Sequence, residues 1–489
     1  MDTSEHSKEE LASLKTRYLY NGQIRLSLLP HYGTKEFHPY LRAGWIAADE
    51  DLAAGYDLVY ELLYHTQFTD TETLLGKIQQ AKATLKSSVN STPYSAELYR
   101  SFGNYVPLYA YYDNFNFLPY YAFLEETEKL MEASPEMVIA KLEEMQNFFH
   151  NRANAISAYA GSAEGIEANA ALADAFLEKL DDTALEPVAY DFEKPAAREA
   201  LIVDSAVQYN CVVSDFETIG MKEYTADLAA VSSLISDVYL MPMLREQYGV
   251  YTPLHGFVDD GGAYFVSYRD PNITETYQVY EELPAFLAEL ETDQETLDGY
   301  ILSSYSSYAM PEGELSGALT AMTSCLSGEP ADLKLQYMRE LKALTPDTLK
   351  AYAAAYEAMM EKGLRFTAGG AAAINAHEEL FDAVLNPFGT VDTSADPATL
   401  GDLAGELFPL FTGESGTPED AVAFFAENGL MDPESTADMP VSAAFAEEFL
   451  AFLSQAVGLP YEADAEATDE PLTKGELSDI LNGWMSLLD

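Results

Sequence analysis

Cysteine is nearly absent from the sequence. The 489 residues contain two, Cys211 and Cys325. Two cysteines exclude a framework of several disulfide bonds and a four-cysteine zinc site. We expect both side chains to be buried, because unpaired cysteine usually behaves as a small apolar residue.

Basic residues are scarce as well. Lysine and arginine together number 26 against 81 aspartates and glutamates, which gives a formal net charge of -55. Such a charge repels nucleic acid and anionic membrane surfaces and attracts cationic partners at low salt. We therefore expect no nucleic-acid partner. Two interpretations of the acidity stay open, a solvated surface or an electric field that attracts a substrate.

Long apolar runs are missing. The N-terminal stretch "MDTSEHSKEELASLKTRY" is polar and lacks the apolar segment of a signal peptide. No run of about 20 apolar residues is evident. We expect a soluble chain with no membrane span, and any secretion signal would lie on sequence outside this chain.

The motifs of several enzyme classes are absent too. The chain contains neither HExxH nor HxxEH, no P-loop and no GxSxG elbow. His6 and His377 lack a second histidine at zinc-peptidase spacing, so we expect both on the surface. The other histidines are scattered: His31, His38, His65, His150 and His255. We expect no metal site, although a cluster assembled in three dimensions stays open.

The patterns that are present divide the chain into regions. Residues 18–191 begin with the strand-like "YLYNGQIRLSLLP" and continue as long helical patterns, including the tyrosine-rich "YSAELYRSFGNYVPLYAYYDNFNFLPYYAFLEETEKLM". Residues 192–388 alternate strand-like and helical patterns. Their main helix carries apolar residues at helical spacing: Leu228, Val231, Leu234, Ile235 and Val238. Residues 389–489 are more acidic, with similar starts at Thr399, Val441 and Leu472 that predict a small helical repeat module.

Two neighbouring segments carry a family resemblance. "YLMPMLREQYGVYTPLHGF" followed by "AYFVSYRDPNITETYQVY" resembles the C-terminal half of presequence-protease-like peptidases in the pitrilysin and insulinase superfamily of zinc peptidases. The similarity covers about residues 10 to 388. It implies an α+β fold of two α/β-roll domains, 18–191 and 192–388, each with an antiparallel sheet packed with helices. Residues 1–17 resemble the end of the linker between the halves.

The resemblance also implies roles for Arg245 and Tyr251. In this family a zinc-binding N-terminal half and a C-terminal half close around an unstructured peptide. Arg245 would hold the peptide carbonyl region, and the Tyr251 hydroxyl would stabilise the oxyanion. From the residues alone, Arg245 could instead cap its helix and Tyr251 pack in a strand. The chain departs from the family pattern Gly-Gly-Ala-Tyr-Gly, because it has Tyr-Gly-Val-Tyr-Thr at 248–252.

A second resemblance concerns residues 389–489. "TLGDLAGEL", "FFAENGLMDPEST" and "LTKGELSDILNGW" are similar to S-layer homology repeats, which bind cell-wall polymers in bacteria. The family's Thr-Arg-Ala-Glu motif is altered, with Leu400 and Lys474 in place of arginine. Wall attachment and a packing or spacer role both stay open.

Two functions follow from these resemblances. The first is the non-catalytic half of a metallopeptidase, inactive alone, with zinc in a separate N-terminal half and no cofactor in this chain. Its substrates would be unstructured peptides, and we hypothesise attraction of basic ones that weakens with salt. The alternative is an inactive peptidase-like binding or scaffold protein, docked to the cell wall or to a partner through the C-terminal module. The chain would act at the cell surface if that module binds the wall, and otherwise in the cytoplasm.

Overall fold

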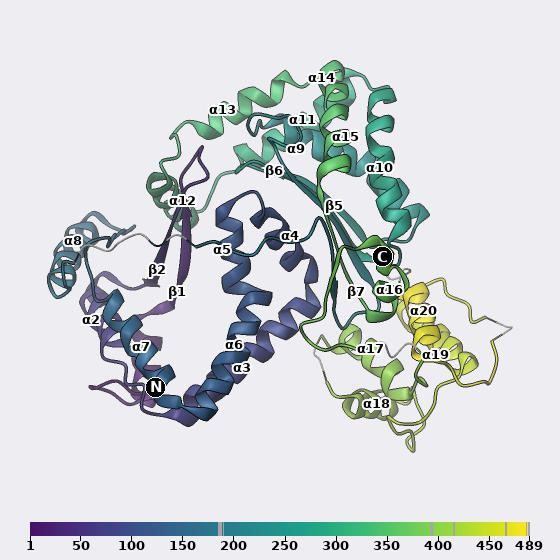
Figure 1. Ribbon diagram of the computed structural model, residues 1–489, viewed down its shortest axis with the longest axis horizontal. Coiled ribbons are helices and arrows are strands. Elements are labelled where there is room, and N and C mark those ends of the chain that lie inside the picture. The colour runs from purple at the N-terminus through teal and green to yellow at the C-terminus, as the bar shows by residue number, and fades with distance from the viewer. Residues whose placement is uncertain are drawn as a thin grey trace.

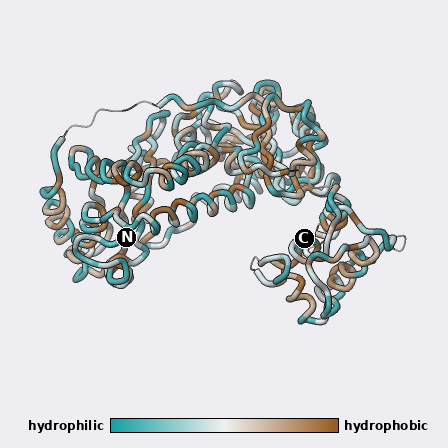
Figure 2. Tube along the Cα trace, turned by 60° about the horizontal axis from the view of Figure 1, so that its bottom comes forward, coloured by the Kyte–Doolittle hydropathy of each residue, from teal (hydrophilic) through white to brown (hydrophobic). Residues whose placement is uncertain are grey.

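The computed structural model of the protein describes residues 1–183, 188, 190–391, 395–413, 416–464, 467–485 and 487. Figure 1 shows a β-hairpin with helices near the N-terminus, a larger sheet covered by helices, and a helical module at the C-terminus. In Figure 2 the C-terminal module forms a separate lobe that joins the rest of the chain on one side. Helices and sheets are thus combined in one chain, as the predicted α+β class requires.

The N-terminal part opens with α1 (Lys8–Tyr18) and a hairpin of β1 (Tyr20–Pro30) and β2 (Phe37–Ile46). These strands pair antiparallel with each other, and no third strand joins them among the described residues. Most of β1 is exposed. At the hairpin tip, the Tyr32 amide donates a 2.9 Å hydrogen bond to the Ser327 carbonyl. The sheet of the first part is therefore a two-stranded antiparallel ladder among the described residues.

The described residues between the hairpin and residue 198 form seven α-helices. Their bounds are α2 (Leu52–Tyr64), α3 (Thr71–Ser91), α4 (Pro93–Gly103), α5 (Pro107–Asn116), α6 (Leu118–Ala133), α7 (Pro135–Phe149) and α8 (Ala163–Glu178). The tyrosine-rich segment is helical as predicted, but it is divided into α4, α5 and α6. Pro107 and Pro119 lie in the first turn of α5 and α6. Proline fits there because first-turn residues donate no intrahelical hydrogen bond.

The second part is built on a six-stranded sheet with the order β5-β6-β4-β7-β3-β8 among the described residues. The strands are β3 (Arg198–Ile202), β4 (Gln208–Asp215), β5 (Thr252–Val258), β6 (Gly262–Asp270), β7 (Leu364–Gly369) and β8 (Ala383–Leu385). β3 runs parallel to β7 and β8, and the other neighbours are antiparallel. The sheet is therefore mixed, not wholly antiparallel, because β7 returns after a long helical connection and inserts between β3 and β4.

Helices cover both faces of this sheet. The helices of the second part are α9 (Asp227–Ile235), η2 (Ser236–Gln247), α10 (Thr274–Glu289), α11 (Gln294–Ala309), α12 (Glu314–Ser327), α13 (Leu333–Glu340), α14 (Pro346–Ala351), α15 (Ala353–Lys362) and α16 (Ala371–Ala376). One face packs against α9 and α10, and the other packs against α4 from the first part. Every residue of β4 is buried, as expected for a strand covered on both sides. These contacts of α4 cross the predicted boundary at residue 191, which stays a prediction.

The continuous helix of α9 and η2 carries the predicted apolar stripe. Leu228, Val231, Leu234 and Ile235 are buried in the core, and Val238 packs against it. From Ser236 onward the hydrogen bonds follow a π-helical pattern, and Pro242 inside η2 has no N–H to donate. Among the described residues, 227–247 form one helix that is long and apolar enough to cross a membrane, with 56% of its apolar window buried. That burial is what a core helix shows.

The third part is a module of α17 (Leu400–Thr412), α18 (Pro418–Glu427), α19 (Ala443–Val457) and α20 (Lys474–Met485). It has its own hydrophobic core, in which the Trp484 indole donates a 2.7 Å hydrogen bond to the Ser454 hydroxyl. The predicted starts at Thr399, Val441 and Leu472 each lie within two residues of a helix. Capping side chains explain this, because Thr399 and Asp402 form a capping box at α17 and Ser442 caps α19.

The two cysteines have different environments. Cys211 is buried in β4, as expected, whereas Cys325 is exposed. The prediction of burial was wrong for Cys325 because it lies on α12, a helix in which Ser327 alone is buried.

Candidate functional site

Arg245 and Tyr251 are held together at one end of the sheet. Arg245 lies in the last turn of η2, and Tyr251 directly precedes β5. Arg245 Nη1 donates a 2.9 Å hydrogen bond to the Tyr251 carbonyl. The guanidinium carbon lies 5.7 Å from the centre of the Tyr251 ring, within the range of a cation–π contact. The structure thus brings together the two residues that the resemblance singled out.

The loop between these residues is tightly closed. The Gly249 amide donates to the Arg245 carbonyl over 3.1 Å, and the Val250 amide donates to the Leu244 carbonyl over 2.9 Å. Gly249 has φ +73°, a conformation that strongly favours glycine. Val250 is fully buried in the core. One glycine at the helix end is therefore enough to turn the chain, although the family pattern has three glycines around the tyrosine.

Tyr251 itself faces outward, with 42% of its surface exposed. Its ring meets the Tyr268 ring edge-on, with 5.8 Å between centroids. Its amide donates a 3.3 Å hydrogen bond to the Arg269 carbonyl at the end of β6. Tyr251 is therefore fixed through its backbone and one ring edge while its side chain stays accessible to a ligand. The ring contacts Tyr268 and Arg245 and is also open to solvent, so both interpretations of Tyr251 stay predictions.

The "SYRDPN" segment, residues 267–272, holds this loop in place. We call its hydrogen-bond network with Asn210 and Thr276 the clamp. The Asp270 carboxylate accepts hydrogen bonds from the Asn210 side chain (2.8 Å), the Thr276 hydroxyl (2.6 Å) and the Asn272 amide (2.8 Å). Asn272 Nδ2 donates in turn to the Tyr248 carbonyl over 2.8 Å. Burial raises the pKa of Asp270, and these donors oppose that rise. The clamp joins β4, β6, α10 and the end of η2, and so sets the position of Arg245 and Tyr251.

Asn210 is the member of this clamp that sequence reasoning missed. It lies in β4, in the otherwise mostly apolar "QYNCVV", and it is fully buried. Its side chain also donates to the Ser267 hydroxyl and the Asn272 carbonyl. A polar residue in a strand that is buried on both faces was the signal that could have identified it.

The C-terminal module lies next to the same clamp. Arg269 has φ +54°, an uncommon value for a residue other than glycine. Its Nη2 lies 4.0 Å from the sulfur of Met485, the last residue of α20. The module thus contacts the residue whose carbonyl holds the Tyr251 amide.

The histidines occupy several environments. His255 is buried, with Nδ1 2.8 Å from the Tyr264 carbonyl and Nε2 2.7 Å from the Tyr356 hydroxyl. Burial lowers the pKa of His255 to about 4. His6 is partly exposed, and its Nδ1 lies 3.0 Å from the buried Glu61 carboxylate.

Comparison with known proteins points to one group of peptidases. Residues 198–364, which include Arg245, Tyr251 and "SYRDPN", match the family model described as the PreP C-terminal domain. The chain is 25% identical over 349 residues to Protein HypA of Clostridium perfringens and 24% identical over 329 residues to presequence protease 1 of Arabidopsis thaliana. These alignments cover 71% and 66% of this chain but 36% and 30% of those proteins. The chain thus spans about a third of the length of these relatives.

Solved structures give a weaker likeness. A peptidase M16 inactive domain from Pseudomonas fluorescens is 15% identical, with a TM-score of 0.48, over 75% of this chain and 85% of that one. Pitrilysin is 11% identical, with a TM-score of 0.47, over 74% of this chain and 38% of that one. The sequence matches carry the conclusion: this chain resembles the C-terminal half of pitrilysin and insulinase-like peptidases.

Proposed function

We propose that this chain is the non-catalytic C-terminal half of a presequence-protease-like metallopeptidase. In this role it encloses an unstructured peptide together with a separate zinc-bearing half and presents Arg245 and Tyr251 to the scissile bond. The observation that carries the proposal is the Arg245–Tyr251 pair, fixed in the segment that matches the family model, with the tyrosine exposed. The name of the Arabidopsis relative, a presequence protease, supports a peptide substrate.

The chemistry divides between the two halves. The zinc site in the other half would supply the activated water, because this chain has neither HExxH nor HxxEH. The Tyr251 hydroxyl would donate a hydrogen bond to the oxygen that becomes negative in the tetrahedral intermediate. The Arg245 guanidinium fixes the Tyr251 backbone and adds positive charge beside that oxygen. A preorganised donor of this kind lowers the barrier because it needs no rearrangement during the reaction.

The net charge of -55 bears on the choice of peptide. An acidic half attracts basic peptides over about 8–10 Å at moderate ionic strength, and added salt screens the attraction. The expected result is that KM for a basic peptide rises with salt, while KM for a neutral peptide of equal length stays nearly constant. Equal salt dependence for both peptides would remove charge as a basis for substrate choice.

The proposal is tested by reconstitution. The chain alone, and the chain mixed with a separately produced HxxEH-bearing half, are incubated with zinc and an unstructured basic peptide, and hydrolysis is followed by mass spectrometry. We expect cleavage in the mixture and none by the chain alone. Cleavage by the zinc half that is not increased by this chain would contradict the proposal.

A second candidate is a binding or scaffold protein without a role in proteolysis. The contact between Arg269 and Met485 favours it, because it places the C-terminal module against the clamp that holds Tyr251. In this case the S-layer-like module would dock the protein to a cell-wall polymer or a partner. Retention of the whole chain on purified cell-wall material, together with no stimulation of a zinc half, is the result expected for this candidate.

A further inference from the structure

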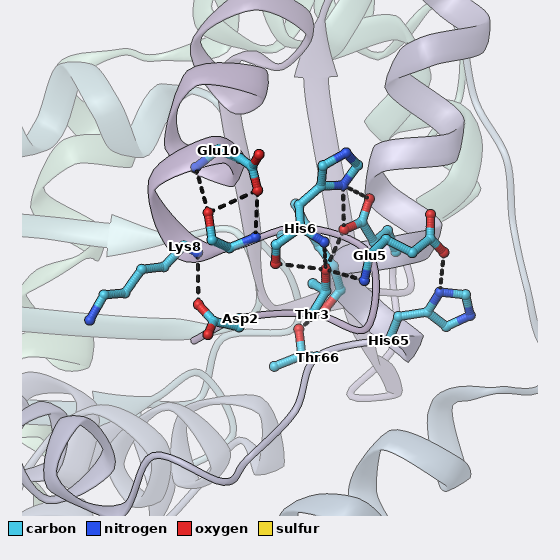
Figure 3. Close-up of polar contacts among 11 residues, drawn as sticks. Asp2, Thr3, Glu5, His6, Lys8, Glu10, His65 and Thr66 are labelled. Carbon is cyan, nitrogen blue, oxygen red and sulfur yellow. Dashed lines mark hydrogen bonds and ion pairs between the residues drawn. The ribbon is translucent and has the colours of Figure 1, made fainter.

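Two glutamates and two histidines meet near the start of the chain. Glu5 and His6 precede α1, Glu61 lies in the last turn of α2, and His65 caps that helix. Ligand atoms of Glu5, His6 and Glu61 all lie within 4.8 Å of one another. Figure 3 shows the labelled Glu5, His6 and His65 side chains gathered around this place. The group has no local motif, because it joins segments more than fifty residues apart in sequence.

The Glu61 carboxylate is the central member of this group. Its residue is 5% exposed, on the otherwise apolar helix "LAAGYDLVYELLY". A buried carboxylate is costly unless a positive charge and hydrogen bonds compensate it. In the described part of the chain, its ion-pair partner is His6, whose Nδ1 lies 3.0 and 3.1 Å from the two oxygens. The Thr3 hydroxyl also donates to Glu61.

Further hydrogen bonds orient the two carboxylates. Thr3 contacts Oε1 of Glu61, and Nδ1 of His65 lies 2.7 Å from Oε1 of Glu5. Metal-binding carboxylates are commonly fixed by such outer partners, which set their orientation and raise their affinity for the ion. Glu61 and His65 lie one helical turn apart, so both project from the same end of α2. Each carboxylate in the group therefore has its own supporting side chain.

We propose that Glu5, His6 and Glu61 bind a divalent transition-metal ion of the Zn²⁺ class. One imidazole nitrogen and two carboxylates form a donor set that suits Zn²⁺ and related ions better than Ca²⁺ or Mg²⁺, which prefer oxygen alone. Ligand bonds of about 2.0–2.2 Å place two donors roughly 3–3.5 Å apart on one ion. In the structure the donor atoms lie within 4.8 Å of one another, so the partly exposed Glu5 and His6 side chains would move closer around an ion while Glu61 is already held.

The site would join the N-terminal segment to α2. A bound cation would neutralise the buried Glu61 carboxylate, with the His6 imidazole as one of its ligands in place of an ion-pair partner. Because the ion binds the folded chain and the group does not form in the unfolded chain, binding adds to the free energy of unfolding. This role is separate from the zinc of the proposed partner half, so failure of one proposal leaves the other intact.

The test is metal titration of the whole chain. Zn²⁺ binding is followed by calorimetry at moderate salt with millimolar Mg²⁺ present, because an acidic chain also collects ions weakly over its surface. The variants are His6→Ala and Glu61→Gln. The matched control is His150→Ala, since His150 also pairs with a carboxylate, that of Asp181, over 3.2 Å. Co²⁺ absorption provides a second signal, because a bound imidazole changes the visible spectrum of the ion.

We expect one tight site in the wild-type chain and in His150→Ala, with affinity lowered at least tenfold in His6→Ala. Glu61→Gln should show the same loss if it folds. His6→Ala keeps the test valid if it does not, because His6 is half exposed. Weak binding to many sites that is unchanged in His6→Ala would overturn the proposal. In that case the group is a metal-free hydrogen-bonded anchor of the N-terminal segment.

Discussion

Arg245 Nη1 donates a 2.9 Å hydrogen bond to the carbonyl oxygen of Tyr251, and its guanidinium lies 5.7 Å from the centre of the same tyrosine ring. One side chain thereby fixes both the backbone and the ring orientation of its neighbour. Tyr251 remains 42% exposed. Arg245 is therefore a positioning residue for Tyr251, and in the proposed peptidase both residues face the substrate.

Arg245→Ala and Tyr251→Phe should separate positioning from chemistry. Arg245→Ala should lower the free energy of unfolding by about 1–2 kcal/mol, because a hydrogen bond and a cation–π contact are lost. Tyr251→Phe should change it by less than about 0.5 kcal/mol, because the ring contacts remain and the hydroxyl belongs to an exposed residue. Urea denaturation measures both values. Equal destabilisation by the two variants would show that the hydroxyl has a structural role.

Asn210→Leu should disrupt the clamp. The substitution removes the 2.8 Å hydrogen bond to Asp270 and leaves that buried carboxylate with fewer donors. We expect a loss of roughly 2–3 kcal/mol in the free energy of unfolding. Asn116→Leu is the control, since Asn116 is exposed and its side chain donates within its own helix, to the Tyr112 carbonyl. A small effect of Asn210→Leu, equal to that of the control, would contradict the role given to the clamp.

Glu97 should make stability fall as pH rises. Both carboxyl oxygens are buried on α4 without a hydrogen bond of good geometry, beside the Cys211 thiol and the Ala368 backbone. Burial raises the pKa of Glu97 well above its usual value. The folded chain therefore keeps a proton that the unfolded chain releases above its ordinary pKa, and the stabilisation present at low pH is lost as pH rises toward the folded pKa.

Glu97→Gln tests this dependence, because the amide keeps the shape of the neutral acid. The stability of the variant relative to wild type should increase between about pH 4.5 and neutrality. Unfolding measured in urea at several pH values gives the difference. A difference that stays flat with pH would mean that the buried glutamate is ionised in the folded chain.

His255 should have the opposite effect on acid stability. Burial lowers the pKa of His255 to about 4, so the folded chain holds it neutral while the unfolded chain binds a proton below about pH 6.5. Its contribution is complete above about pH 6.5 and disappears as pH falls through 4, with a total of roughly 3 kcal/mol. His255→Gln should remove this acid-dependent part of the unfolding curve. If the free energy of unfolding falls equally at low pH in the variant and in wild type, His255 is not the cause of the acid dependence.

The sequence predicted those helices whose signal lies within a few neighbouring residues, such as the spacing of apolar side chains or a capping residue. The stripe from Leu228 to Ile235 is buried as expected, because helical spacing alone determines which face meets the sheet. The capped starts of the C-terminal helices are equally local, since a capping threonine or serine and its partner lie three residues apart. The divided tyrosine-rich helix could also have been foreseen from Pro107 and Pro119.

The remaining features depend on contacts between distant segments. The position of β7 between β3 and β4 is set by pairing across more than 150 residues, which no local pattern encodes. Asn210 meets Asp270 across the sheet, and Glu61 meets His6 across α1 and the hairpin. The family resemblance singled out Arg245 and Tyr251, but their contact with each other was not predicted. Their roles at a scissile bond stay a prediction.

The most direct test of the central claim is the rate of peptide cleavage by the reconstituted halves when Tyr251 is replaced by phenylalanine. Tyr20→Phe is the matched control, because Tyr20 is likewise exposed, at 63%, and lies on β1. The account predicts a fall in kcat of about 10²–10³ for Tyr251→Phe, as for the loss of an oxyanion donor, and no change for Tyr20→Phe. An unchanged kcat for Tyr251→Phe in an active mixture would contradict the account.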